Sequence, residues 1–211
     1  MKGLLYKDLV TIYRQYRANW LLVLVLYTLL GFALEMPFFF YALPFLMGGY
    51  MVGLLASEES CGWESYARTL PVTLAQRVGT KYLLGLLLTA VGGALSLVLM
   101  LLTGAAWADA LAGSLGAAAA TLLYLGVHFP MQWKFGTAKA RSWTLALVGA
   151  TAAAILLLIQ LPAAWAQVLA VLFAPLLDSA WFWLAAGPLV VLGLYAVSFG
   201  VSMQVCKGER G

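Results

Sequence analysis

Charged residues are scarce in this 211-residue chain, where they make up 9% of the sequence. Soluble globular domains use charged residues at about a quarter of their positions. The low charge therefore excludes an ordinary soluble domain. With 64% hydrophobic residues and a mean hydropathy of +0.95, the composition instead predicts an all-α membrane protein that crosses the bilayer several times.

Motifs that carry catalytic or metal chemistry are also lacking. No GxxxxGK[ST] phosphate-binding loop occurs, so this chain by itself cannot bind and hydrolyse ATP in the P-loop manner. There is no GxSxG, and the one histidine, His128, cannot form a two-histidine metal site. Glu58-Glu59 opens the EExxxR pattern of membrane metalloproteases, but Trp63 stands where that pattern needs arginine. We therefore expect no catalytic residue, no metal ligand and no cofactor in this chain.

Features of secreted proteins are missing too. The two cysteines, Cys61 and Cys206, both fall near ends that we expect to be cytoplasmic, where thiols stay reduced, so no disulfide is predicted. Charges run through the first seventeen residues, and no small-residue cleavage site precedes a short apolar core. We expect no removable signal peptide.

The intervals between charged residues predict the membrane spans, because a span needs about 20 apolar residues and a charge at its centre costs about 2.5–3.5 kcal/mol. These intervals are residues 18–34, 36–57, 82–108, 110–133, 142–177 and 179–206. Five of them fit one helix each, but 142–177 is too long for one helix and too short for two. There we expect a helix from Ser142 to Gln160, ended by Leu161-Pro162, and then an outer re-entrant segment over 161–180.

All twelve Lys and Arg residues fall on one side of this six-helix layout. They stand before the first helix, in the loops after the second and fourth helices, and in the C-terminal tail. The opposite side carries only Glu35, Asp109 and Asp178. Because basic loops stay in the cytoplasm, we predict that both termini are cytoplasmic, in a bacterial cytoplasmic membrane. The net charge of +4 then serves topology and contact with anionic lipid, and we expect no nucleic-acid partner.

The segment before the first span, residues 1–19, has apolar residues at helical spacing, among them Leu5, Leu9 and Ile12. This pattern predicts an interfacial helix that lies along the inner leaflet. A straight helical extension of the first span is the alternative, and the pattern fits it equally well.

Residues 57–81 form the longest polar passage inside the chain, and Gly62 and Pro71 divide it. Between these two breakers, Trp63, Tyr66 and Leu70 recur at three- and four-residue spacing, which predicts a short amphipathic helix of about two turns.

Two further features complete this passage. Glu64 and Arg68 lie beside the aromatic face of the predicted short helix. After it, Thr73 is placed to cap the helix that enters the third span. Simple anchoring of Trp and Tyr at the membrane interface is the alternative interpretation of the aromatic face.

The passage also resembles a known family. Its acid pair, Gly-Trp-Glu-x-Tyr, Thr-Leu-Pro-Val-Thr, an arginine and Lys-Tyr-Leu are similar to the first cytoplasmic loop of type-2 ABC transporter permeases. The likeness is greatest to the small subfamily that includes exporters of amphipathic cytolytic peptides, and the opening MKGLLYKDL is similar as well. Thr73-Leu74-Ala75 departs from the pattern, which has a serine followed by basic residues.

The resemblance implies one permease domain over 1–211 that pairs with a second permease subunit, either identical or a paralogue. It also implies two copies of a separately encoded P-loop ATP-binding subunit, which would hold ATP and Mg. The short helix and its surroundings, residues 57–81, would then be the coupling loop. The residues implied in docking the ATPase are Glu58, Glu59, Trp63, Glu64, Tyr66, Arg68, Leu70 and Pro71.

The function that follows is ATP-driven export of an amphipathic or hydrophobic substrate, with peptides among the candidates. The alternative from another class is a membrane scaffold or assembly protein whose loop binds a soluble cytoplasmic factor without transport.

Overall fold

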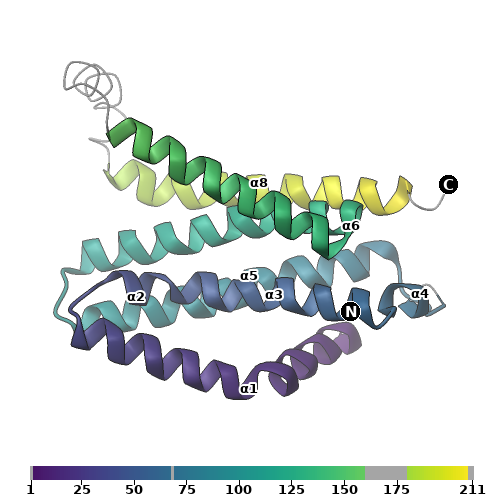
Figure 1. The fold of residues 1–211 in the computed structure, drawn as a ribbon, viewed down its shortest axis with the longest axis horizontal. Coiled ribbons are helices and arrows are strands. Elements are labelled where there is room, and N and C mark those ends of the chain that lie inside the picture. The colour runs from purple at the N-terminus through teal and green to yellow at the C-terminus, as the bar shows by residue number, and fades with distance from the viewer. Residues whose placement is uncertain (1, 68, 160–179, 209–211) are drawn as a thin grey trace.

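A computed structural model describes residues 2–67, 69–159 and 180–208, and Figure 1 shows a bundle of helices. Strands are absent from these residues. The helices are α1 (Lys2–Ala33), α2 (Phe38–Tyr41), α3 (Leu43–Ser60), α4 (Trp63–Ala67), α5 (Leu74–Leu102), α6 (Trp107–Ile159) and α8 (Ala180–Gly208). Five helical stretches within this part of the chain are long and apolar enough to cross a membrane. The predicted all-α membrane architecture is therefore confirmed.

The helix α6 is two antiparallel arms that meet at Gly136, and Figure 1 shows them as a teal arm followed by a green one. Gly136 has φ 77° and ψ 168°, a conformation that is open essentially to glycine alone. The predicted intervals 110–133 and 142–177 leave residues 134–141 as the loop after the fourth helix. That loop was wrong in its extent, because the chain reverses at Gly136 alone and stays helical on both sides. The second arm, which follows Gly136, contains the fifth helix predicted from Ser142.

The predicted stop at Leu161-Pro162 lies outside the described residues. So does the re-entrant segment over 161–180, apart from Ala180, which begins α8. The last predicted span, 179–206, agrees closely with α8.

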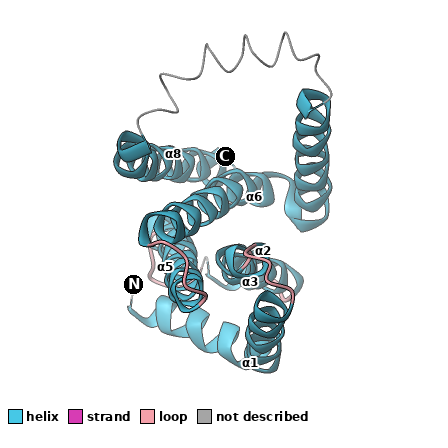
Figure 2. Ribbon diagram, turned by 90° about the vertical axis from the view of Figure 1, so that its left-hand side faces the viewer, coloured by secondary structure: helices cyan, strands magenta, loops and turns pink. Residues whose placement is uncertain are grey.

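The N-terminal segment and the first predicted span form one helix, α1, without a break between Lys2 and Ala33. Figure 2 looks nearly along the bundle and shows that α1 bends: its N-terminal part runs across the view, whereas its later part is seen nearly end-on. The bend gives the N-terminal part of α1 a direction of its own inside a continuous helix. Its position at a membrane interface stays a prediction.

The second predicted span consists of α2 and α3, which follow one another with only Ala42 between them. Pro37 occupies the N-cap position of α2, and Pro44 lies in the first turn of α3, where its missing N–H costs no helical hydrogen bond. The helix α3 runs on to Ser60, beyond its predicted end near Ser57. Gly62 then ends this helical stretch with a positive φ of 68°.

The buried core lies where α3, α5, α6 and α8 meet. Met51, Leu54, Leu84 and Leu125 are completely covered. Beside them, the Tyr82 hydroxyl of α5 lies 2.7 Å from Ser198 Oγ and 2.8 Å from Ser202 Oγ, both on α8. Apolar packing and a few polar contacts between helices thus fix α5 against α8.

The two ends of the bundle differ in charge. Figure 1 places the N-terminus of α1, the short helix α4 and the C-terminal end of α8 at the same end, where the two arms of α6 also join. We call this the basic end, because the four basic segments of the sequence gather there. At the other end, Glu35 lies in the turn before α2, and Asp109 lies in the first turn of α6. The structure thus brings together the segments that were predicted to share one side of a membrane.

Candidate functional site: the loop between α3 and α5

The short helix predicted in this loop is present as α4, but it covers only Trp63–Ala67. The prediction of about two turns reaching Leu70 was wrong. Pro71 disfavours helical backbone at the residue before it, and the Thr69 hydroxyl donates a hydrogen bond to the Tyr66 carbonyl oxygen at 2.8 Å, which closes a turn instead. Residue 68, an arginine, lies outside the described part of the chain.

The helix α4 presents an aromatic surface at the basic end. The ring of Tyr66 is 58% exposed, and its centroid lies 5.5 Å from the ring of Trp63, which is half-buried. Ala67 on the opposite side is buried against the rest of the chain. Leu70 is half-buried and Pro71 is exposed, both in the turn that follows. Two of the three predicted aromatic and apolar residues therefore lie side by side on one short helix.

The start of α5 is fixed as the sequence predicted. Thr73 is its N-cap, and its hydroxyl accepts a hydrogen bond from the Gln76 backbone N–H at 3.2 Å. In return, the Gln76 side chain accepts from the Thr73 backbone N–H at 3.1 Å, which completes a capping box. The loop is thereby held in a defined position where it enters α5.

One ion pair joins α4 to α5. Arg77, which is 8% exposed, donates from Nη1 to Glu64 Oε1 over 2.7 Å. Glu64 itself is more than half exposed, so the pair lies at the edge of the protein. A displacement of α4 would therefore pull directly on the first turns of α5.

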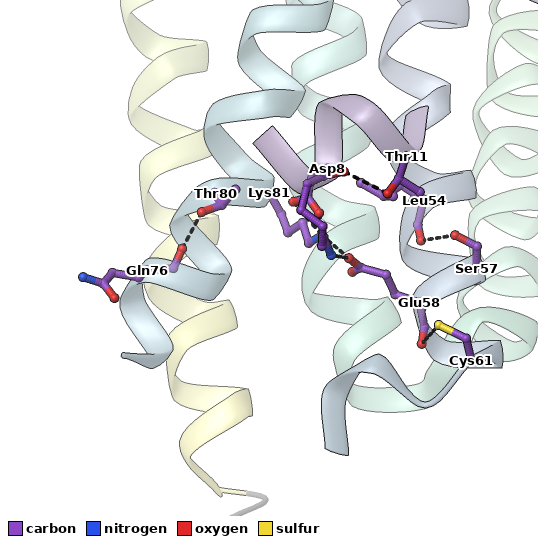
Figure 3. Close-up of polar contacts among 10 residues, drawn as sticks. Asp8, Thr11, Leu54, Ser57, Glu58, Cys61, Gln76, Thr80 and Lys81 are labelled. Carbon is purple, nitrogen blue, oxygen red and sulfur yellow. Dashed lines mark hydrogen bonds and ion pairs between the residues drawn. The ribbon is translucent and has the colours of Figure 1, made fainter. Parts of the chain in front are cut away.

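A network of two acids and two bases links α1, α3 and α5 beneath α4. Lys81 of α5 donates to Asp8 Oδ2 over 2.8 Å and to Glu58 Oε1 over 2.6 Å. Lys7 of α1 also pairs with Glu58, and its Nζ lies 2.7 Å from Asp8 Oδ1. Figure 3 shows Lys81, Asp8 and Glu58 turned toward one another from their three helices.

This network is buried and electrically balanced. The side chain of Asp8 is 1% exposed, that of Lys81 is 9% and that of Glu58 is 12%. Buried charges persist only when they are paired, because each one loses several kcal/mol of solvation. Asp8 was missed by the sequence reasoning, which looked for charge inside the spans. The available signal was a single acid within an otherwise basic N-terminal segment.

A cation–π contact connects this network to α4. The Lys7 Nζ lies 3.8 Å from the centre of a Trp63 ring. Such contacts contribute about 0.5–2 kcal/mol, depending on how far water is excluded. Lys7 therefore contacts Glu58 of α3 and Trp63 of α4 at once, and α1 is tied to the loop.

The second acid of the pair, Glu59, connects the loop to α6. Its Oε2 accepts a hydrogen bond from the Thr137 backbone N–H at 2.8 Å, at the start of the second arm. A carboxylate in this position caps the free N–H groups of a helix and interacts well with its dipole. Glu58 and Glu59 thus both have partners inside this chain, on different helices.

The cavity that the described residues form at this junction is small. The cavity beside Trp63, Arg77 and Lys81 measures only about 40 Å³, enough for a water molecule or two. No group of His, Cys, Asp and Glu in the described residues could hold a metal ion, and Cys61 is an exposed free thiol. What this arrangement offers is an exposed aromatic helix connected by polar contacts to α1, α3, α5 and α6.

Comparison with known proteins agrees with this architecture. The chain matches the family described as ABC-2 family transporter protein over residues 3–207, which is nearly its full length. Neither the curated proteins nor the solved structures include a match to it. The members of this family are the membrane components of ABC transporters, which work with an ATP-binding subunit. This integral membrane protein therefore belongs to the ABC-2 transporter family.

Proposed function

We propose that this chain is the permease subunit of an ATP-driven exporter in a bacterial cytoplasmic membrane, with its basic end in the cytoplasm. It would pair with a second permease subunit, identical or a paralogue, and with two copies of a P-loop ATPase that hold ATP and Mg. The membership of the family supports the permease role. The twelve basic residues on one side support the orientation.

The observation that carries the docking proposal is the environment of α4. Tyr66 and Trp63 form an exposed aromatic pair at the basic end, and aromatic residues are enriched in the anchors of protein interfaces. Plain anchoring in the lipid interface would require no connection from α4 to other helices. The Glu64–Arg77 pair and the Lys7–Trp63 contact supply two such connections.

In this scheme α4 acts as the coupling helix. Closure of the ATPases on ATP displaces α4, and the displacement passes to α5 through Arg77 and to α1 and α3 through Lys7 and Glu58. Glu58 and Glu59 then serve to transmit force inside the permease, through Lys81 and the Thr137 backbone. The residues that would touch the ATPase are Trp63, Glu64, Tyr66, Leu70 and Pro71, which are at least partly exposed, together with Arg68, which lies outside the described part of the chain.

The cargo proposal follows from the scarcity of charge. The membrane helices carry aliphatic and aromatic side chains over most of their surfaces, which suits an amphipathic or hydrophobic substrate such as a peptide better than an ion or a sugar. Export rather than import rests on the resemblance of the loop to exporter permeases.

Co-purification tests the docking proposal. The permease and its ATPase are co-expressed, and the double variant Trp63→Ala/Tyr66→Ala is compared with wild type for ATPase retained in detergent. We expect most of the ATPase to be lost. The matched control is Tyr6→Ala, which removes a 72% exposed aromatic from the N-terminal part of α1. Full retention by the double variant would place docking elsewhere, and capture of a soluble factor without ATPase activity would favour the scaffold alternative.

A further inference from the structure

A cavity of about 540 Å³ opens between α3 and the two arms of α6, separate from the coupling loop. Its size falls within the range of small-molecule sites, about 300–1,000 Å³. Tyr124, His128 and Gln132 follow one another at four-residue intervals on the first arm, so they form one face of that helix. Thr137 and Arg141 lie opposite them on the second arm.

Two of these side chains, Tyr124 and His128, already make contacts within the chain. The Tyr124 ring stacks on His128 with centroids 5.6 Å apart and meets Phe45 of α3 at 4.9 Å. His128 Nδ1 lies 2.8 Å from the Thr144 hydroxyl, which bridges the two arms. The His128 ring therefore shapes the cavity and leaves ligand binding to its neighbours.

Gln132 is the unsatisfied group. It is 5% exposed, and neither its Nε2 nor its Oε1 makes a hydrogen bond of good geometry among the described residues, although its amide is within reach of a weak hydrogen bond to the His128 ring. A buried amide without partners costs about 1–3 kcal/mol for each group left unmade. Because Gln132 lines the cavity, a ligand with hydrogen-bonding groups would remove that cost.

Arg141 supplies a positive charge at the same cavity. It is exposed, and no ion pair connects it to any residue in the described part of the chain. Glu59 of α3 accepts a hydrogen bond from the Thr137 backbone N–H, one helical turn before Arg141, and makes no ion pair with Arg141. The free cation and the free amide together favour an anion with several acceptor oxygens.

The large apolar residues of the lining lie farther from the basic end. Phe45 and Val52 of α3 and Leu145 of the second arm line it, and Phe45 and Leu145 are 46% and 65% exposed at its rim. From Phe45 to Ala56, which also lines the cavity, α3 spans about 16 Å at 1.5 Å per residue. The cavity thus has polar residues at the end near Arg141 and an elongated apolar part that opens at the surface of the bundle.

We propose that this cavity binds one anionic phospholipid. Its phosphate headgroup would lie at Gln132 and Arg141, and an acyl chain would extend along Phe45, Val52 and Leu145. A single acyl chain is narrower than a helical peptide, which is about 10–12 Å wide, so the elongated apolar part of the cavity favours a lipid chain. This inference concerns the chain itself and does not depend on transport.

Native mass spectrometry of the full chain in detergent tests it, with phosphatidylglycerol as the anionic lipid and phosphatidylcholine as the neutral one. We expect wild type to bind phosphatidylglycerol about tenfold more tightly, the effect of one charge-assisted hydrogen bond. Arg141→Gln should abolish that preference. Lys139→Gln, which removes an exposed charge that does not line the cavity, should keep it.

Three results would overturn the proposal. Equal binding of both lipids by wild type would show that the cavity has no anion site. If Lys139→Gln lost the preference for phosphatidylglycerol as fully as Arg141→Gln, the preference would come from the general positive charge of the basic end. Displacement of the lipid by inorganic phosphate alone would assign the site to a soluble anion. Ala138→Trp, which fills the cavity from an exposed position, should weaken both lipids, and unchanged binding by that variant would place the lipid elsewhere.

Discussion

Removal of Lys81 offers the sharpest test of the buried network. Lys81→Met keeps the length of the side chain but withdraws the ammonium that pairs with Asp8 and Glu58 at 2.8 and 2.6 Å. The four-residue network changes from two charges of each sign to one cation, Lys7, facing two carboxylates. Loss of one partner from a buried ion pair costs about 3–5 kcal/mol, because the charge left behind is not solvated.

A second substitution separates the interaction from the general effect of a mutation. Asp8→Asn alone leaves an excess cation at a site that is 1% exposed, and we expect it also to destabilise. The double variant restores equal numbers of each charge. If the two residues act as a pair, it should be less destabilised than the sum of the single variants by about 1–3 kcal/mol.

Unfolding of the purified chain by SDS titration in mixed micelles measures these differences. Lys2→Met is the matched control, since it removes an exposed lysine from the same end of α1 and should change stability by less than about 0.5 kcal/mol. Additive effects of Lys81→Met and Asp8→Asn would refute the reasoning, because they would mean that the two side chains do not interact in the folded protein.

Two further predictions concern the backbone. Gly136→Ala should destabilise the hairpin by about 1–3 kcal/mol, since φ 77° with ψ 168° is strained for any side chain and the new Cβ would lie 2.9 Å from Glu59 Oε1. Unfolding in SDS measures this loss. The control Gly149→Ala, at a helical site with open space around the Cβ, should be nearly neutral. Thr73→Ala should cost about 1 kcal/mol by removing the N-cap of α5, whereas Thr73→Ser should retain stability, and an equal loss in both variants would argue against capping.

The elements that local chemistry decides could be predicted from the sequence. Thr73 caps α5 because a hydroxyl at that position can reach a backbone N–H three residues later, and no distant residue is involved. Gly62 interrupts the helix for a similarly local reason. The gathering of basic segments at one end was also predictable, since two predicted helices separate each basic segment from the next and return the chain to the same side.

Contacts between distant residues could not be found in this way. Asp8 and Lys81 are 73 positions apart, and nothing in the local pattern of either residue specifies the other. The reversal at Gly136 was missed for a different reason. Charged residues were taken to mark a loop over 134–141, yet charged side chains can extend from a helix that continues on both sides of one glycine.

The turn between the two arms of α6 is a single residue, so it has no flexible connection that could change length. A longer connection would absorb a shift of α3 by changing its own conformation, but here Glu59 is fastened to Thr137, immediately after the turn. A movement of α3 at the basic end would consequently be passed directly to the second arm, and with it to the cavity wall that carries Arg141.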